Sequence, residues 1–253
     1  MPSISDMNGK AALVTGAASG LGRATALALG RAGADLCIVD VNAAALGETA
    51  SLLAAEGVRS LLHAADLAER DNCSRAVSAT VEEFGRLDAL CNVAGIIVLC
   101  NAHEMSKIDF EKTLAVNLSA PFYLMQAAIP HLLRAHGAVV NVTSSAAFVG
   151  EAYAAAYCAT KAGLTQMTKA LAMEYVHQPI RFNAVAPGGM MTNIGANIKM
   201  PVGADRALIS RFSGLRGMVD VDDVADMIAY LASDAGRSYH GACISIDKGI
   251  TAG

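Results

Sequence analysis

Short apolar runs alternate with longer segments of helical periodicity along the chain, and this alternation restricts the fold more than any other feature. Seven runs are typical of buried strands, at residues 10–15, 35–40, 59–66, 87–95, 137–144, 180–188 and 242–247. Six helical segments lie among them, at residues 20–32, 43–55, 71–84, 110–134, 153–176 and 221–232. Such alternation predicts a three-layer, doubly wound α/β fold with a seven-stranded parallel sheet buried on both faces.

The length and composition predict a single domain over residues 1–253. The chain is 54% hydrophobic and has no break in composition that would separate two domains. Only the segment 188–219, rich in Met and Gly, interrupts the alternation, between the sixth strand and the last helix. We interpret it as a flap over a substrate site.

Charge and cysteine content argue against several classes of protein. A formal net charge of -4, with 19 Lys and Arg and no basic run, disfavours nucleic acid and anionic membranes as partners. The longest apolar tract, at 89–102, is too short for a membrane span and is broken by Asn92. The N-terminus lacks the pattern of a secretory signal, and the six cysteines have neither disulfide nor zinc spacing. We therefore expect a cytoplasmic protein without a metal.

A glycine-rich turn lies between the first predicted strand and the first predicted helix. The sequence there is TGAASGLG, with Gly16, Gly20 and Gly22 flanking Ser19 and Leu21. Glycines permit a tight turn and a close approach of the backbone, and amides at a helix N-terminus favour a pyrophosphate. The spacing differs from the standard G-x-G-x-x-G, and such turns also occur for purely structural reasons. The turn nevertheless predicts a dinucleotide site.

Asp40 ends the second predicted strand, about twenty residues after the turn. A carboxylate there accepts hydrogen bonds from the adenosine ribose hydroxyls and repels a 2'-phosphate. The following residues, Val41 and Asn42, supply no compensating cation. The sequence therefore predicts NAD rather than NADP, although a polar strand end is the plainer alternative.

Later strand ends extend the same predicted crevice. Asp66 and Leu67 follow the third strand, and Asn92, Ala94 and Gly95 belong to NVAG after the fourth. We expect all five to bind the adenosine part of the cofactor. Each by itself is no more than an ordinary strand-to-helix turn.

Tyr157 and Lys161 stand four residues apart in the helical segment 153–176, so they share one helix face. A tyrosine that acts as a base near pH 7 to 8 needs about 3 to 4 kcal/mol of phenolate stabilisation. An ammonium at about 4 Å supplies roughly that amount at an effective dielectric constant near 20. A Tyr-x-x-x-Lys pair also arises by chance. Ser144, thirteen residues earlier, strengthens the prediction because its hydroxyl can donate to a substrate oxygen; spacing leaves Ser145 as an alternative.

Taken together, these motifs resemble those of the short-chain dehydrogenase/reductase family, over nearly the whole chain. TGAASGLG is similar to the cofactor turn of the family, and NVAG to its second motif, with Val93 where Asn is commoner. Asn117, in LAVNLSAPF, matches the helix asparagine of the family. Ser144, Tyr157 and Lys161 fall on its catalytic positions, and PGGMMT at 187–192 resembles its nicotinamide-side loop.

The resemblance implies a Rossmann fold, a homotetramer and several further roles. Asn117 would hold a water that joins Lys161 to solvent in a proton relay. The carboxamide of the nicotinamide would be oriented by Ile180 and by the loop residues Pro187, Gly188, Met190 and Thr192. The usual DGG near the C-terminus is DKG here, at 247–249, and we expect this departure to affect subunit contacts.

The predicted function is NAD(H)-dependent interconversion of a secondary alcohol and a ketone, with Tyr157 as the acid and base. The partner is then a small-molecule alcohol or ketone. One alternative is a reductase of 3-oxoacyl thioesters on a carrier protein or coenzyme A, and Asp40 counts against it. Another is a nucleotide-sensing protein without turnover, which has no need of the proton-relay set of Asn117, Ser144, Tyr157 and Lys161.

Overall fold

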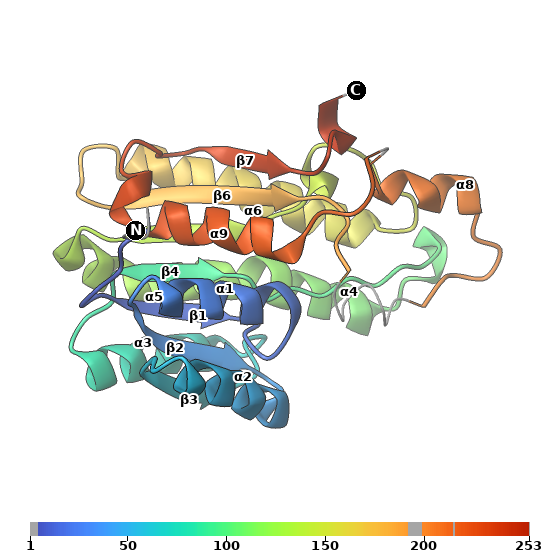
Figure 1. Cartoon of the computed structure of the whole chain (residues 1–253). Helices are drawn as coiled ribbons and strands as arrows, with labels where there is room; N and C mark the ends of the chain where they lie inside the picture. The colour runs from blue at the N-terminus through green and yellow to red at the C-terminus, as the bar shows by residue number, and fades with distance from the viewer. Residues whose placement is uncertain (1–4, 192–198, 215, 253) are drawn as a thin grey trace.

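The computed structural model describes residues 5–191, 199–214 and 216–252, which form one sheet with helices on both faces (Figure 1). Its strands are β1 (Ala11–Thr15), β2 (Asp35–Asp40), β3 (Ser60–Ala64), β4 (Ala89–Asn92), β5 (Ala138–Val142), β6 (Arg181–Pro187) and β7 (Cys243–Ile246). All neighbouring pairs are parallel, in the order β3-β2-β1-β4-β5-β6-β7. The predicted α/β fold with a seven-stranded parallel sheet is confirmed.

The strand order reverses beside β1. The chain builds β2 and β3 on one side of β1 and then crosses to place β4 on the other side. Thr15 of β1 is in register with Val39, and Val14 with Cys91, so the carboxyl ends of these strands meet at one edge. A crevice at such a reversal is where ligands bind in open α/β sheets.

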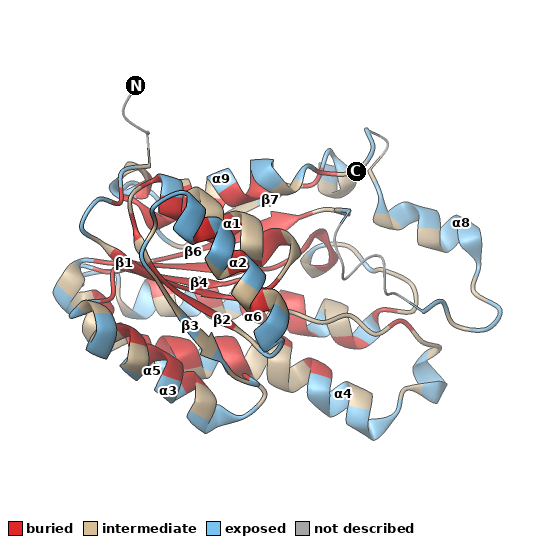
Figure 2. Ribbon diagram, turned by 60° about the horizontal axis from the view of Figure 1, so that its bottom comes forward, coloured by how far each residue is buried: buried red, intermediate tan, exposed pale blue. Residues whose placement is uncertain are grey.

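Helices cover both faces of the sheet (Figure 2). One face carries α1 (Gly20–Arg31), α2 (Ala43–Ala55) and α9 (Val221–Ala232), and the other carries α3 (Arg70–Phe84), α5 (Ala120–Ala135) and α6 (Ala155–Glu174). Successive strand residues point to opposite cores: Val14 packs with Leu29 and Ile228, whereas Leu13 packs with Leu124. This double burial explains why the inner strands are largely apolar, whereas the edge strands β3 and β7 are partly exposed.

The predicted helix 110–134 differs from the structure. It is α4 (Lys107–Leu114), a π-helical turn at Ala115–Ser119 and then α5. A π turn holds one extra residue, and the side chain of Asn117 within it bonds to the backbone of Ile96. Apolar periodicity alone does not reveal such a turn.

The described residues also include shorter helical turns. These are α8 (Arg206–Ile209) and 3-10 turns at Ala102–Glu104, Ser145–Ala147, Ser210–Phe212, Asp234–Gly236 and Ile250–Ala252.

The segment predicted as a flap, 188–219, extends beyond the carboxyl edge of the sheet and carries α8 in its described part (Figure 1). A bridge between Met190 and Val219 closes its base.

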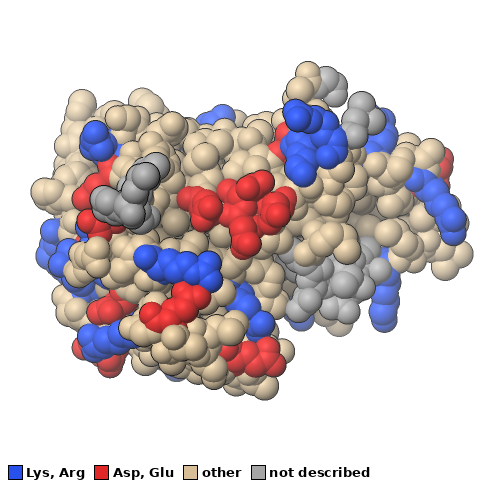
Figure 3. Space-filling model, viewed as in Figure 1, with Lys and Arg blue, Asp and Glu red and all other residues tan. Residues whose placement is uncertain are grey.

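None of the helices in the described ranges combines the length and apolarity that a membrane crossing requires. Figure 3 shows basic and acidic side chains interspersed on one face of the molecule. A cluster of acidic side chains lies over α9, whose first turn holds Asp222 and Asp223.

Candidate active site

The glycine-rich turn lies where β1 enters α1, at the reversal of the strand order. Gly16 and Gly20 have φ angles of 70° and 50°, which favour glycine. A methyl group on Gly16 would come within 2.9 Å of Ala94 Cα, and one on Gly22 would overlap the Gly16 carbonyl group. The turn therefore has no room for a side chain at Gly16 or Gly22. The residues of the turn at the start of α1 line a cavity. A helix N-terminus in this position suits an anionic group.

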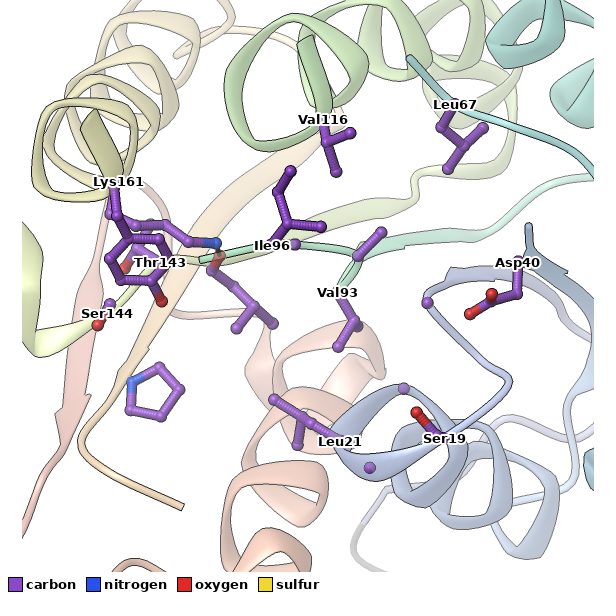
Figure 4. A pocket seen from close by; sticks show the side chains of 18 of the residues that line it. Ser19, Leu21, Asp40, Leu67, Val93, Ile96, Val116, Thr143, Ser144 and Lys161 are labelled. Atoms are coloured by element: carbon purple, nitrogen blue, oxygen red, sulfur yellow. Dashed lines mark hydrogen bonds between the residues drawn. The ribbon is translucent and has the colours of Figure 1, made fainter. Parts of the chain in front are cut away.

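The cavity has a volume of about 320 Å³ and follows the carboxyl ends of the strands (Figure 4). It brings together most of the residues that the sequence selects for the cofactor: Gly16, Ser19, Gly20, Leu21, Gly22, Asp40, Val41, Asp66, Leu67, Ala94, Gly95, Tyr157, Lys161, Pro187, Gly188 and Met190. Ser144 lines it as well. The glycine turn and the Tyr157 region thus belong to one continuous space.

Asp40 lines the end of the cavity near the glycine turn (Figure 4). Its carboxylate accepts hydrogen bonds from the backbone N–H groups of Ala18, at 3.1 Å, and Asn42, at 2.9 Å. The nearby Arg23 guanidinium is engaged by the Ala18 carbonyl oxygen and by Glu48, at 2.6 and 2.9 Å. This end of the cavity therefore presents the carboxylate of Asp40, held in place by two backbone N–H groups. The nearby Arg23 guanidinium is already paired with Glu48.

Tyr157 and Lys161 lie one turn apart on α6, with Lys161 Nζ 5.6 Å from the centroid of the tyrosine ring. Lys161 is buried, and its ammonium donates to the Val142 carbonyl oxygen at 2.9 Å. Burial lowers the pKa of Lys161 to about 8. Burial also raises the pKa of Tyr157 to about 12, against a smaller lowering by the Ser144 hydroxyl.

These shifts differ from the sequence prediction, in which the ammonium lowers the pKa of the phenol. Desolvation dominates the shift of each group, and the Lys161 ammonium is bonded to the Val142 carbonyl oxygen and is not among the groups that lower the pKa of Tyr157. Spacing along a helix reveals neighbours but not their exposure to solvent.

Of the two candidate serines, Ser144 is the one at the tyrosine. It follows β5, lines the cavity, and its hydroxyl interacts with Tyr157. It also accepts a hydrogen bond from the Ala146 N–H at 3.2 Å, which fixes its direction. Ser145 is buried, and its hydroxyl is 3.5 Å from the Glu151 carboxyl group instead.

Asn117 is fully buried in the π-helical turn. Its amide accepts from the Ile96 N–H and donates to the Ile96 carbonyl oxygen, both at 2.8 Å, and it lies 3.3 Å from Thr160 Oγ1. A methyl group on Gly95 would contact both Lys161 Nζ, at 3.4 Å, and Asn117 Oδ1, at 3.5 Å. The side chain of Asn117 thus locks the backbone beside the Lys161 ammonium.

Among the described residues that the sequence selects, Asn92 and Ile180 do not line the cavity, and neither does the buried Asn117. Asn92 is buried behind the lining, where its amide donates to Asn141 Oδ1 at 2.8 Å across the β4–β5 pair. Ile180 precedes β6 at the amino edge of the sheet and packs in the core with Phe182, so its assignment to the carboxamide is wrong. Thr192 lies outside the described residues.

Several lining residues were not selected from the sequence: Ala65, Val93, Ile96, Lys112, Val116, Val142 and Thr143. Most are immediate neighbours of selected residues, so wider windows around each strand end would have included them. Lys112 and Val116 are four residues apart before Asn117, and helical periodicity would have found this shared face.

The strand order, the tight glycine turn and the carboxylate at the end of β2 define a dinucleotide-binding α/β protein. Comparisons with known proteins agree. A family model described as enoyl-(acyl carrier protein) reductase matches residues 16–251. D-threitol dehydrogenase of Mycolicibacterium smegmatis is 37% identical over 246 residues, covering 97% of this chain and 94% of that protein.

Two further relatives cover almost the whole chain. Cyclohexanol dehydrogenase of Acinetobacter sp. is 33% identical over 246 residues, covering 96% of each protein. The crystal structure of a short chain dehydrogenase from Burkholderia cenocepacia in complex with NADP has a TM-score of 0.87 at 32% identity, covering 96% of this chain and 98% of that one. The chain belongs to the short-chain dehydrogenase/reductase family.

Proposed function

We propose that this protein interconverts a secondary alcohol and a ketone with NAD(H). The observation that carries the proposal is one cavity with the Ser144 hydroxyl, the Tyr157 phenol and the Lys161 ammonium at one end, and the glycine turn and Asp40 at the other. Relatives named for D-threitol and cyclohexanol support an alcohol substrate. A panel of secondary alcohols incubated with NAD tests the proposal through formation of reduced nicotinamide. No reduction with any alcohol would contradict it.

Tyr157 exchanges the proton of the substrate oxygen, and Ser144 steadies that oxygen. The hydroxyl of Ser144 interacts with the phenol, so a substrate oxygen that binds both can donate to one and accept from the other. The bound nicotinamide supplies the site that accepts or returns a hydride. The glycine turn and Asp40 would hold the adenosine and pyrophosphate parts of this cofactor.

Lys161 supports the tyrosine by charge. With a pKa of about 8, its amine is largely protonated at pH 7 and can stabilise a transient phenolate. Asn117 acts beside it, because its two hydrogen bonds to Ile96 fix the backbone that borders the ammonium. We assign the proton relay to Lys161, with Asn117 in a supporting position beside it.

Replacing Asp40 by alanine is expected to raise the ratio of NADP to NAD affinity by about tenfold or more. The substitution removes an acceptor for the ribose hydroxyls and the charge that repels a 2'-phosphate. Asp40→Asn separates the two effects, because it removes the charge and keeps an acceptor oxygen for the turn. Fluorescence titration with NADH and NADPH measures both affinities.

A matched control is Asp35→Asn, at the opposite end of β2, where Asp35 lies 3.5 Å from Arg59. This control should leave the ratio of affinities unchanged. If Asp40→Ala also leaves it unchanged, Asp40 does not select the cofactor.

The main rival is a reductase of 3-oxoacyl thioesters. The family model is described as a reductase of another carrier-protein thioester, the enoyl form, which has a C=C bond in place of the ketone. Asp40 counts against this rival because biosynthetic reductases commonly draw on NADPH. Assays of a 3-oxoacyl thioester with NADPH and of alcohols with NAD separate the two activities. A nucleotide-sensing protein would bind the cofactor and turn over neither substrate.

We also propose a homotetramer in a reducing cytoplasm. Apolar side chains exposed on α5 and α6, such as Phe122 at 39% and Met173 at 71%, suit a subunit contact. All six cysteines are free, as a reducing compartment favours. Light scattering tests the assembly, and a 26.0 kDa monomer at micromolar concentration would refute it.

A further inference from the structure

Two side chains join α2 to the glycine turn, and the proposed function gives them no role. One is Arg23, in the first turn of α1. It donates from Nε to Thr49 Oγ1 at 2.9 Å and from Nη2 to the Ala18 carbonyl oxygen at 2.6 Å. The same Nη2 donates to the Ala45 carbonyl oxygen at 3.2 Å and to Glu48 at 2.9 Å. Arg23 therefore ties the turn to the helix that follows β2.

Thr49 completes this link from the side of α2. Its side chain is fully buried, and its hydroxyl donates to the Ala17 carbonyl oxygen at 2.8 Å while it accepts from Arg23. The Ala45 carbonyl oxygen is farther from the hydroxyl, at 3.4 Å. Two successive carbonyl oxygens of the turn, those of Ala17 and Ala18, are thus held by side chains. Loss of the Thr49 hydroxyl would leave a buried acceptor without a partner, which is costly.

The direction of the Ala17 carbonyl group decides where the adjoining N–H group points. In a trans peptide the N–H points away from the C=O. The N–H opposite the Ala17 carbonyl belongs to Ala18, and it donates to Asp40 Oδ2 at 3.1 Å. One peptide unit of the turn is therefore held at its oxygen by Thr49 and bonded at its nitrogen to the carboxylate that lines the cavity.

Asp40 is anchored to both of the parts that this link joins. Its Oδ2 accepts from the turn, at Ala18, and its Oδ1 accepts from the Asn42 N–H at 2.9 Å. Asn42 caps α2, because its side chain accepts from the Ala45 N–H at 3.1 Å. Each carboxylate oxygen keeps a further acceptor position for a ligand. The spacing between the turn and the start of α2 therefore sets the direction of the Asp40 carboxylate.

We propose that Arg23 and Thr49 are positioning residues for the dinucleotide. They hold the glycine turn against α2 at the spacing at which the Asp40 carboxylate accepts from the hydroxyls of the adenosine ribose. Neither side chain is part of the cavity lining, so both act through Asp40 and not by contact with the cofactor. This inference rests on the cofactor site of the proposed function.

Titration with NADH tests this role in variants that alter the link. Thr49→Val keeps the shape of the side chain and removes the hydroxyl, and it should raise the Kd for NADH by about tenfold. Thr49→Ser keeps the hydroxyl and should stay within about threefold of wild type. Arg23→Lys keeps the charge but lacks the planar fork that reaches both Thr49 and the Ala18 carbonyl oxygen, so it should also raise the Kd by about tenfold.

A double-mutant cycle separates positioning from a general loss of packing. In the Asp40→Ala background, Thr49→Val should raise the Kd for NADH by less than about threefold, because the carboxylate that Thr49 positions is already absent. If the two single effects multiply in full, Thr49 does not act through Asp40 and the inference is overturned.

A matched control is Thr80→Val, which also removes a fully buried threonine hydroxyl. Thr80 lies on α3, outside the cavity lining, and donates to the Ala76 carbonyl oxygen at 2.7 Å. It should leave the Kd for NADH unchanged, and a rise equal to that of Thr49→Val would overturn the inference. Unchanged affinity in Thr49→Val or in Arg23→Lys would overturn the assignment of that residue.

Failure of this inference can be told from failure of the proposed function. A wild-type protein that does not bind NADH overturns both. A wild-type protein that binds NADH but oxidises no alcohol contradicts the proposed function alone, and the affinities of the variants still support or overturn the positioning role.

Discussion

Replacing Tyr157 by phenylalanine is expected to lower kcat for alcohol oxidation by roughly a hundredfold to ten-thousandfold, the range that general acid–base catalysis contributes. The substitution removes one oxygen atom and keeps the aromatic ring near Lys161. The glycine turn and Asp40 stay intact, so affinity for NAD should change by less than about threefold. Steady-state kinetics and a cofactor titration measure the two effects separately.

Tyr239→Phe is the matched control, because it removes the same atom from a tyrosine outside the cavity lining, whose ring packs on Tyr230. It should keep wild-type kcat. Near-wild-type turnover by Tyr157→Phe on the best substrate would show that another group transfers the proton.

Replacing Gly22 by alanine is expected to disrupt the cofactor turn. The added methyl group would overlap the Gly16 carbonyl group, and its nearest neighbours are backbone atoms that cannot rotate away. The turn must shift, at a cost of about 1 to 3 kcal/mol or more. Affinity for NAD should fall by about tenfold or more because the amides move with the turn. Thermal denaturation and NADH titration measure these changes.

Gly47→Ala is the control for this substitution. Gly47 lies within α2, and a methyl group there would meet open space. Alanine should maintain or raise stability by about 0.5 to 1 kcal/mol because it favours the helix. Wild-type stability and affinity in Gly22→Ala would contradict the tight packing of the turn.

Most of the sheet could be predicted from the sequence because burial on both faces makes the inner strands β1, β2, β4, β5 and β6 largely apolar. Runs such as 35–40 therefore stand out between helical segments, and β2 is Asp35–Asp40. The π-helical turn could not be predicted in this way. Its cause is a contact between Asn117 and Ile96, twenty-one residues apart, which no local periodicity contains.

The candidate site was predictable where function depends on a strand end or a helix face. Gly16, Asp40 and Lys161 all line the cavity for this reason. Ile180 was misplaced because it stands at the amino end of β6, whereas the cavity lies at the carboxyl end. The choice of Ser144 over Ser145 depends on the direction of the backbone after β5, which residue spacing does not reveal.

The most direct test of the central claim follows one hydrogen atom. A secondary alcohol carrying deuterium at its carbinol carbon is incubated with NAD and the wild-type protein, and the reduced cofactor is analysed by mass spectrometry. Hydride transfer predicts one deuterium in each reduced nicotinamide and a ketone as the other product. Reduced cofactor without deuterium, or no reduction with any alcohol that the protein is offered, would contradict the account.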